Sequence, residues 1–275
     1  MKMTKKIFSI VALTFILTGC MTTQYERGVS SNLVNYLYPK GQLKSHKNDQ
    51  LPVLNLPLRV GIALVPESKT DSRFLLAEFE KQNLLESVAA RFKADKSISH
   101  IEVIPEIYLK QGRGFITIEQ IANMYDIDVI ALVSYDQVAI NELNNFSLAY
   151  WTIVGAYIIP GESTEFQTFV DTAVFDIKTR KMLFRAPGLH SNSRNHTAVG
   201  FEKRNRKMRI EGFDIAANKM TENLTVELSK FKRRVKEEGV AKVAFREGVS
   251  YGGGGLDWLG IILLFLLLRF TRTKN

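Results

Sequence analysis

Cysteine is almost absent from this 275-residue chain, which holds only Cys20, and histidine is scarce, with four residues. A single cysteine excludes an internal disulfide and any Cys-x-x-Cys motif, so packing alone must hold the fold. No HExxH motif is present, which leaves little basis for a metal site. The only GxSxG sequence, at 248–252, precedes an apolar stretch near the C-terminus and does not follow a predicted strand of the domain, so no nucleophile elbow is expected. These absences disfavour metalloenzymes, thiol enzymes and hydrolases of the elbow type.

The N-terminus has the three parts of a secretory signal. Three lysines, at positions 2, 5 and 6, precede an apolar run from Ile7 to Leu17, and small residues then lead to Cys20. An apolar run of eleven residues is too short for a lasting membrane span but suits the h-region of a signal peptide. We therefore expect residues 1–19 to be removed during export.

The end of this signal resembles the bacterial lipobox. Leu17, Thr18, Gly19 and Cys20 stand where lipoproteins carry the sites of signal peptidase II and of the acylation enzymes. The resemblance implies that Cys20 is cleaved at its amino side and joined to membrane lipid. Met21 stands where an inner-membrane lipoprotein often carries Asp, so the same resemblance implies the outer membrane. The alternative, an ordinary buried cysteine, fits poorly with a position at the end of an h-region.

The C-terminus carries a second apolar segment. Residues 256–270 contain only Asp257 and Arg269 as charged groups, and two further cations follow in the last four positions. Counted from the preceding glycines, about 19 residues form a helix of roughly 28 Å, which just spans a hydrocarbon core. The cationic end predicts a cytoplasmic C-terminus, with everything between the two apolar segments outside the inner membrane.

Four glycines, Gly252, Gly253, Gly254 and Gly255, precede this span. Glycine lowers helix propensity by about 1 kcal/mol per residue, so this boundary should stay extended, as a protease that cuts at a membrane surface requires. This C-terminal arrangement, a glycine run followed by an apolar span and a basic tail, resembles the GlyGly-CTERM signal. The resemblance implies cleavage by rhombosortase, a rhomboid-type intramembrane protease. Together with the lipobox, the chain resembles the rhombotarget lipoprotein family. The alternative is a permanent anchor behind a flexible linker.

Removal of both targeting segments changes the charge. Residues 1–19 carry three lysines, and the residues after Gly255 carry three cations and one aspartate, so the net charge of +9 falls to +4. Much of the basicity belongs to targeting, which argues against a nucleic-acid partner.

The pattern between these segments predicts one α+β domain at residues 57–239, with a tether at 20–56 and a linker at 240–255. Strands are expected at 58–65, 100–105 and 127–135, separated by amphipathic helices, one from Leu76 through Phe79 to Phe92 and one capped by Thr117. This alternation is typical of a mainly parallel sheet. An antiparallel hairpin at 166–185 and a long helix from Phe213 to Val235, stopped at Gly239, follow. The apolar run 148–161 fits a helix or a strand.

No catalytic, metal or cofactor constellation emerges from the remaining polar residues. His190 and His196 are placed on a loop, Gly112 and Gly114 in a turn, and Ser134 at a strand end near Asp136 as a weak hydrolase candidate. Two further carboxylates of the hairpin, at positions 171 and 176, are five apart and fall on opposite faces of a strand.

Two basic clusters flank the long helix. Five cations at 203–209 are placed before it, where they could meet anionic headgroups, and five at 230–236 lie in its last turns, where the helix dipole favours them. An ordinary solvated face is the competing interpretation of both. The chain is thus predicted to be a non-enzymatic, lipid-anchored envelope protein of a Gram-negative bacterium, in the periplasm or at the cell surface, with an unidentified protein partner.

Overall fold

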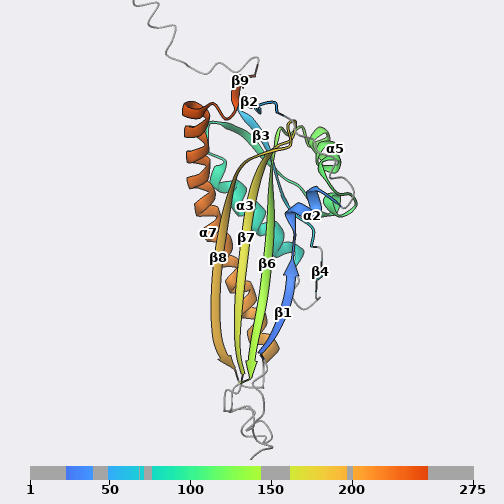
Figure 1. Ribbon diagram of the computed structural model, residues 1–275, viewed down its shortest axis with the longest axis vertical. Helices are drawn as coiled ribbons and strands as arrows, with labels where there is room; N and C mark the ends of the chain where they lie inside the picture. The colour runs from blue at the N-terminus through green and yellow to red at the C-terminus, as the bar shows by residue number, and fades with distance from the viewer. Residues whose placement is uncertain are drawn as a thin grey trace, which may run out of the picture.

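The computed structural model describes residues 23–39, 49–67, 69–70, 76–143, 162–196 and 201–246 (Figure 1). The strands are β1 (Thr23–Ser30), β2 (Val53–Leu56), β3 (Leu58–Leu64), β4 (Lys69–Thr70), β5 (Ile98–Val103), β6 (Val129–Leu143), β7 (Glu162–Asp176), β8 (Lys181–His196) and β9 (Lys242–Phe245). The helices are α2 (Leu33–Leu37), α3 (Glu78–Phe92), α4 (Glu106–Lys110), α5 (Phe115–Tyr125) and α7 (Phe201–Glu238). The predicted α+β class is confirmed.

The long strand β6 organises the main sheet. Along one edge it pairs antiparallel with β7 from Val129 to Leu143, and β7 pairs with β8 to complete the predicted hairpin. The other edge is shared: the first half of β6 pairs parallel with β3, and its second half pairs antiparallel with β1. Strand β5 extends the sheet beyond β3, and β4 extends it beyond β1. A separate two-stranded parallel sheet joins β2 to β9.

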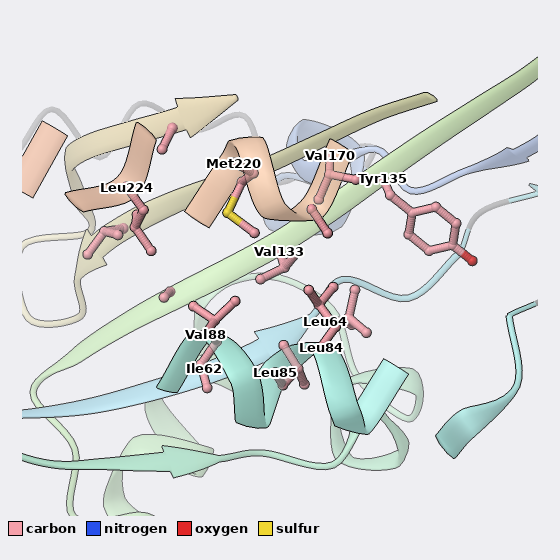
Figure 2. Close-up of a cluster of buried hydrophobic side chains, with 14 of the residues drawn as sticks. Ile62, Leu64, Leu84, Leu85, Val88, Val133, Tyr135, Val170, Met220 and Leu224 are labelled. Carbon is pink, nitrogen blue, oxygen red and sulfur yellow. The ribbon is translucent and has the colours of Figure 1, made fainter. Parts of the chain in front are cut away.

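Helices cover both faces of the sheet. Alternation along β6 sends Val129, Ala131 and Val133 to one face and Ile130 and Leu132 to the other, as a strand buried on both sides requires. Helices α3 and α7 cover the first face, and Figure 2 shows their side chains meeting those of β3, β6 and β7 there. Helices α2, α4 and α5 cover the second face.

Helix α7 has 38 residues and runs along β7 and β8 for about 57 Å at 1.5 Å per residue. Its predicted apolar stripe is confirmed, with Phe213, Ala217, Met220 and Leu224 buried. The predicted end at Gly239 is confirmed too, because that residue has a φ of +65°. Close approach to β8 depends on Gly188, since a Cβ there would lie 2.1 Å from the Ala216 carbonyl oxygen.

The predicted tether at 20–56 is wrong over much of its described length. Thr23–Ser30 forms β1 inside the main sheet, Leu33–Leu37 forms α2, and Val53–Leu56 forms β2. Polar composition concealed β1 because its stability comes from pairing with β6, more than a hundred residues away in the chain. The ordered fold therefore begins within three residues of Cys20.

Several local predictions are corrected as well. Phe79 is 73% exposed, because Lys81 instead occupies the helical stripe that continues through Leu84, Leu85 and Val88. The N-cap of α5 is Gly114, whose φ of +82° suits glycine, and the Thr117 hydroxyl donates to the Arg113 carbonyl. The first basic cluster lies inside the first turns of α7 rather than before it. The run 148–161 lies outside the described residues.

Candidate functional site

The residues predicted to undergo processing lie outside the described part of the chain: Leu17, Thr18, Gly19 and Cys20 at one end, and Gly252, Gly253, Gly254 and Gly255 at the other. Among the described residues, no helix combines the length and apolar character that a membrane span needs. The structure does describe the residues from which both segments depart, Thr23 and Arg246.

The two points of departure lie at opposite ends of the molecule (Figure 1). Thr23 pairs with Glu142 near the end of β6, whereas Arg246 contacts Asp128, immediately before β6 begins. Fourteen residues of extended chain separate Asp128 from Glu142, which corresponds to about 45 Å at 3.3 Å per residue. Any attachment at Cys20 and any attachment through the tail therefore hold the domain at its two ends.

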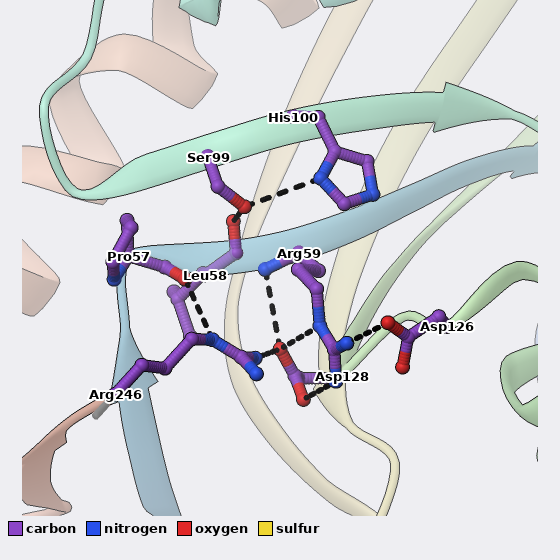
Figure 3. A network of polar contacts seen from close by, with 8 residues as sticks. All are labelled: Pro57, Leu58, Arg59, Ser99, His100, Asp126, Asp128 and Arg246. Atoms are coloured by element: carbon purple, nitrogen blue, oxygen red, sulfur yellow. Dashed lines mark hydrogen bonds and ion pairs between the residues drawn. The ribbon is translucent and has the colours of Figure 1, made fainter. Parts of the chain in front are cut away.

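A polar network fixes the end from which the tail departs (Figure 3). The Arg246 guanidinium pairs with Asp128, and its Nε donates to the Pro57 carbonyl at 3.3 Å. Asp128 also accepts from Arg59, whose NH2 group lies 3.1 Å from Oδ1, and Arg59 reaches Asp126 as well. Burial of Asp128 works against ionisation, but the two arginines outweigh it and hold its pKa below the usual value.

A second polar cluster lies beyond the carboxyl ends of the parallel strands β3 and β5. Lys81, in the first turn of α3, is 4% exposed and lies 2.8 Å from Glu106 Oε2 and 3.1 Å from Glu67 Oε1. Tyr135 donates to the same Glu67 oxygen at 2.5 Å. The connection that follows β3 runs through α3 on one face of the sheet, whereas the connection that follows β5 runs through α5 on the other face. Open α/β sheets commonly bind ligands where neighbouring connections leave toward opposite faces.

The electrostatics of this cluster favour a structural role for Lys81. Burial is the largest influence and opposes its charge, but Glu106 and Glu67 together outweigh burial and raise its pKa. The lysine stays protonated at neutral pH and cannot serve there as a nucleophile or a base. An adjoining cavity of about 240 Å³ is lined by Leu64, Leu85 and Ile104 as well as by Lys81 and Glu106. Sequence periodicity offered one signal for the cluster, the lysine on the buried stripe of α3.

The hydrolase candidate is not placed as predicted. Ser134 lies within β6 rather than at its end, is 7% exposed, and donates to the Asp171 carbonyl at 3.4 Å. Asp171, which lies opposite Ser134 on β7, forms a salt bridge with Arg185, whose NH2 group lies 2.9 Å from Oδ2. Asp136 follows two residues later on the same strand. The Ser134 hydroxyl thus bonds to a backbone carbonyl and not to a general base, which is a poor arrangement for activating a nucleophile.

The other candidates are separated by the fold. His190 and His196 belong to β8 and not to a loop, and six residues of strand place them about 20 Å apart. The Asp176 carboxylate accepts a hydrogen bond from the Thr179 backbone amide in the hairpin loop, whereas Asp171 forms a salt bridge with Arg185. Gly112–Gly114 lies in the connection between α4 and α5, as predicted. Within the described residues, no three acidic, histidine or cysteine side chains are grouped as metal ligands.

No protein-family model matches the sequence, and no curated protein matches it. Among the solved structures that align with the chain are two with low TM-scores. A PelC dodecamer from Paraburkholderia phytofirmans aligns with a TM-score of 0.25 and 9% identity, over 73% of this chain and 99% of that one. Lipoprotein GNA1162 from Neisseria meningitidis aligns with a TM-score of 0.23 and 12% identity, over 59% of this chain and 96% of that one. Likeness at this level does not bear on function.

Proposed function

We propose that this chain is a non-enzymatic envelope lipoprotein that is anchored through acylated Cys20 and loses its C-terminal segment at the glycine run. The observation that carries the proposal is the pairing of two targeting patterns, a lipobox at residues 17–20 and glycines 252–255 before an apolar span. The fold is compatible with both, because the described domain stands between them and contains neither. The membership of the rhombotarget lipoprotein family belongs to the same proposal.

The predicted partners follow from these patterns. Signal peptidase II and the acylation enzymes act at Cys20, and a rhombosortase-type rhomboid protease acts near Gly252–Gly255. The lipid on Cys20 then holds the domain at the outer membrane, in the periplasm or at the cell surface. A lasting second anchor adds little to a protein that already carries several acyl chains, which is why a removable tail is favoured.

The domain itself is proposed to act as an interaction or assembly module. Its neighbouring helices α4 and α5 leave four large apolar side chains between 44% and 58% exposed: Ile107, Tyr108, Ile116 and Met124. Exposed apolar side chains gathered on adjacent elements are typical of protein contact surfaces. Charged replacements of Ile116 and Met124 should therefore reduce cross-linking of the chain to its envelope partner while leaving thermal unfolding unchanged.

A second candidate is a doubly anchored structural lipoprotein that keeps its C-terminal helix. The attachment points at opposite ends of the sheet favour it, because two anchors about 45 Å apart could bridge two surfaces. The mass of the mature protein separates the two candidates.

Intact mass spectrometry of the chain from its native envelope, with and without the rhomboid protease, is the decisive experiment. A form that begins at acylated Cys20 and ends within 252–255 supports the proposal, provided that this end disappears without the protease. A mass that includes residues 256–275 in both backgrounds overturns the cleavage and leaves the doubly anchored candidate. An unmodified Cys20 overturns both.

A further inference from the structure

An apolar cavity of about 80 Å³ lies between helices α3 and α7 and the sheet. Val88, Ala89 and Phe92 line it from α3, and Leu224, Leu228 and Phe231 line it from α7. One water needs about 10–15 Å³ of such space, so the cavity could hold several. Among the described residues that line it, however, only Ser97 is polar, and its hydroxyl already donates to Asp95 at 2.6 Å.

Protein cores rarely leave a space of this size unfilled, because the lining atoms lose dispersion contacts. Water does not fill it well, since the walls offer almost no hydrogen-bond partners. An apolar group from another molecule would restore the missing contacts. The apolar walls of the cavity therefore favour a hydrocarbon chain as the ligand.

A wider groove of about 690 Å³ adjoins the cavity. The two spaces share four lining residues, Leu58, Ser97, Leu228 and Phe231. Beyond them the groove is bounded by apolar residues of β2 and the segment around β9, Leu54, Leu56, Ala241 and Val243, and by the last turns of α7. A narrow inner chamber thus lies directly beside a wide outer one.

Charge at the outer chamber is mainly positive. Lys96, Lys232 and Lys236 line it together with one acidic residue, Asp95. Asp95 is matched by Lys232, whose Nζ lies 2.6 Å from Oδ2. Within the described residues Lys236 forms no ion pair, so the groove keeps cationic charge beside its apolar walls. An anionic headgroup would be favoured at this place.

We propose that the cavity and the groove form one binding site for a long-chain fatty acid, with the hydrocarbon chain inside and the carboxylate beside Lys236. A single unbranched chain can enter the inner chamber, whereas an α-helix about 10 Å across, such as one formed by the chain's own tail, cannot. Lipid on Cys20 of the same molecule is also too distant: an acyl chain spans about half of a 30 Å hydrocarbon core, and the two ends of the sheet are about 45 Å apart.

Photolabelling of the full chain in lipid nanodiscs tests this site. The probe is palmitic acid with a diazirine at mid-chain, and labelled peptides are mapped by mass spectrometry. Saturable labelling of residues 88–92 and 224–231, removed by excess palmitic acid, is the expected result. Labelling spread evenly over the chain, or confined to residues 256–270, overturns the proposal.

Two pairs of variants sharpen the test. Ala89→Trp fills the inner chamber and should abolish labelling, while Ala90→Trp, the next residue on the same helix but exposed, should keep it. Equal labelling of both overturns the site. Circular dichroism and thermal unfolding establish that the two variants fold alike.

Lys236→Glu, which changes a lysine that lines the groove, provides a second test if Ala89→Trp does not fold. It should weaken palmitic acid binding at least fivefold and leave binding of uncharged hexadecanol unchanged, since the loss of one cation near a charged group alone costs about 1 kcal/mol. Arg233→Glu makes the same charge change on the same helix away from the groove lining and should alter neither. Equal effects of the two glutamates on palmitic acid overturn the carboxylate assignment. The outcome does not depend on cleavage of the tail, so it can fail separately from the proposed function.

Discussion

Arg246 pairs with Asp128 across 118 positions of the chain and thereby ties the last described residue to the start of the central strand. The same carboxylate accepts from Arg59, so one aspartate joins β3, the start of β6 and the base of the C-terminal tail (Figure 3). A pull on the tail is therefore resisted at the main sheet and not only at the small β2–β9 sheet.

Acid should weaken this junction. The pKa of Asp128 is lowered in the folded protein, so its stabilisation is complete above the unfolded value near 3.8 and is lost as the pH falls below it. Asp128→Asn should lower the free energy of unfolding by about 1–3 kcal/mol at pH 7, because it leaves Arg59 and Arg246 without their shared carboxylate. Urea unfolding between pH 7 and pH 2 measures both effects.

The variant should also show a shallower loss of stability below pH 4 than the wild type. Glu86→Gln, which removes an exposed carboxylate of α3 that has no arginine partner among the described residues, serves as the control. Parallel pH profiles for Asp128→Asn and the wild type would contradict the assignment.

Lys81 should matter for the stability of the fold, where it neutralises neighbouring carboxylates, rather than for catalysis. Lys81→Met leaves Glu67 and Glu106 buried without their shared cation and should cost about 3–5 kcal/mol. Lys81→Met combined with Glu106→Gln should recover part of that loss, as a double-mutant cycle in urea would show. Additive losses would mean that the two side chains do not interact.

Close packing of α7 on β8 predicts different results for two glycines. Gly188→Ala places a Cβ 2.1 Å from the Ala216 carbonyl oxygen and 2.5 Å from the Met220 amide nitrogen, so it should cost about 3 kcal/mol or more. Gly239→Ala meets no atom within 4 Å and has only the strain of a φ of +65° to bear, about 1 kcal/mol. Thermal unfolding compares the two; equal losses would exclude the steric explanation.

The proposed attachment of the domain at its two opposite ends predicts a change of orientation when the tail is removed. Nine residues, 247–255, separate Arg246 from the apolar segment and reach about 30 Å when extended, less than the 45 Å between the ends of the sheet. In one membrane, a domain held by both anchors cannot stand upright. Neutron reflectometry on supported bilayers should find a thinner protein layer for the full chain than for a chain that ends at Gly255.

A form with 20 glycine and serine residues inserted after Tyr251 is the matched control. The longer linker reaches the membrane from the far end of the domain, so this form should match the truncated chain in layer thickness. Identical thickness for all three forms would contradict the two-ended attachment.

Periodicity predicted those elements whose buried positions can be recognised from neighbouring residues in the sequence. The stripe of α7, the alternation of the β7–β8 hairpin and the apolar core of β6 each follow from neighbouring residues. Phe79 looked like a core residue, but the buried stripe of α3 passes through Lys81 instead. The carboxylates that make a buried lysine tolerable come from Glu67 and Glu106, on other segments.

The sequence by itself predicted the targeting pattern at each end and determined the α+β class and the long helix, because each depends on residues close together in the chain. Only the tertiary structure decided that polar Thr23–Ser30 is a strand, that Arg246 pairs with Asp128, and that an apolar cavity adjoins a groove lined by three lysines. These features arise from pairings between distant segments, whose free energy depends on which surfaces meet and not on the composition of either segment alone.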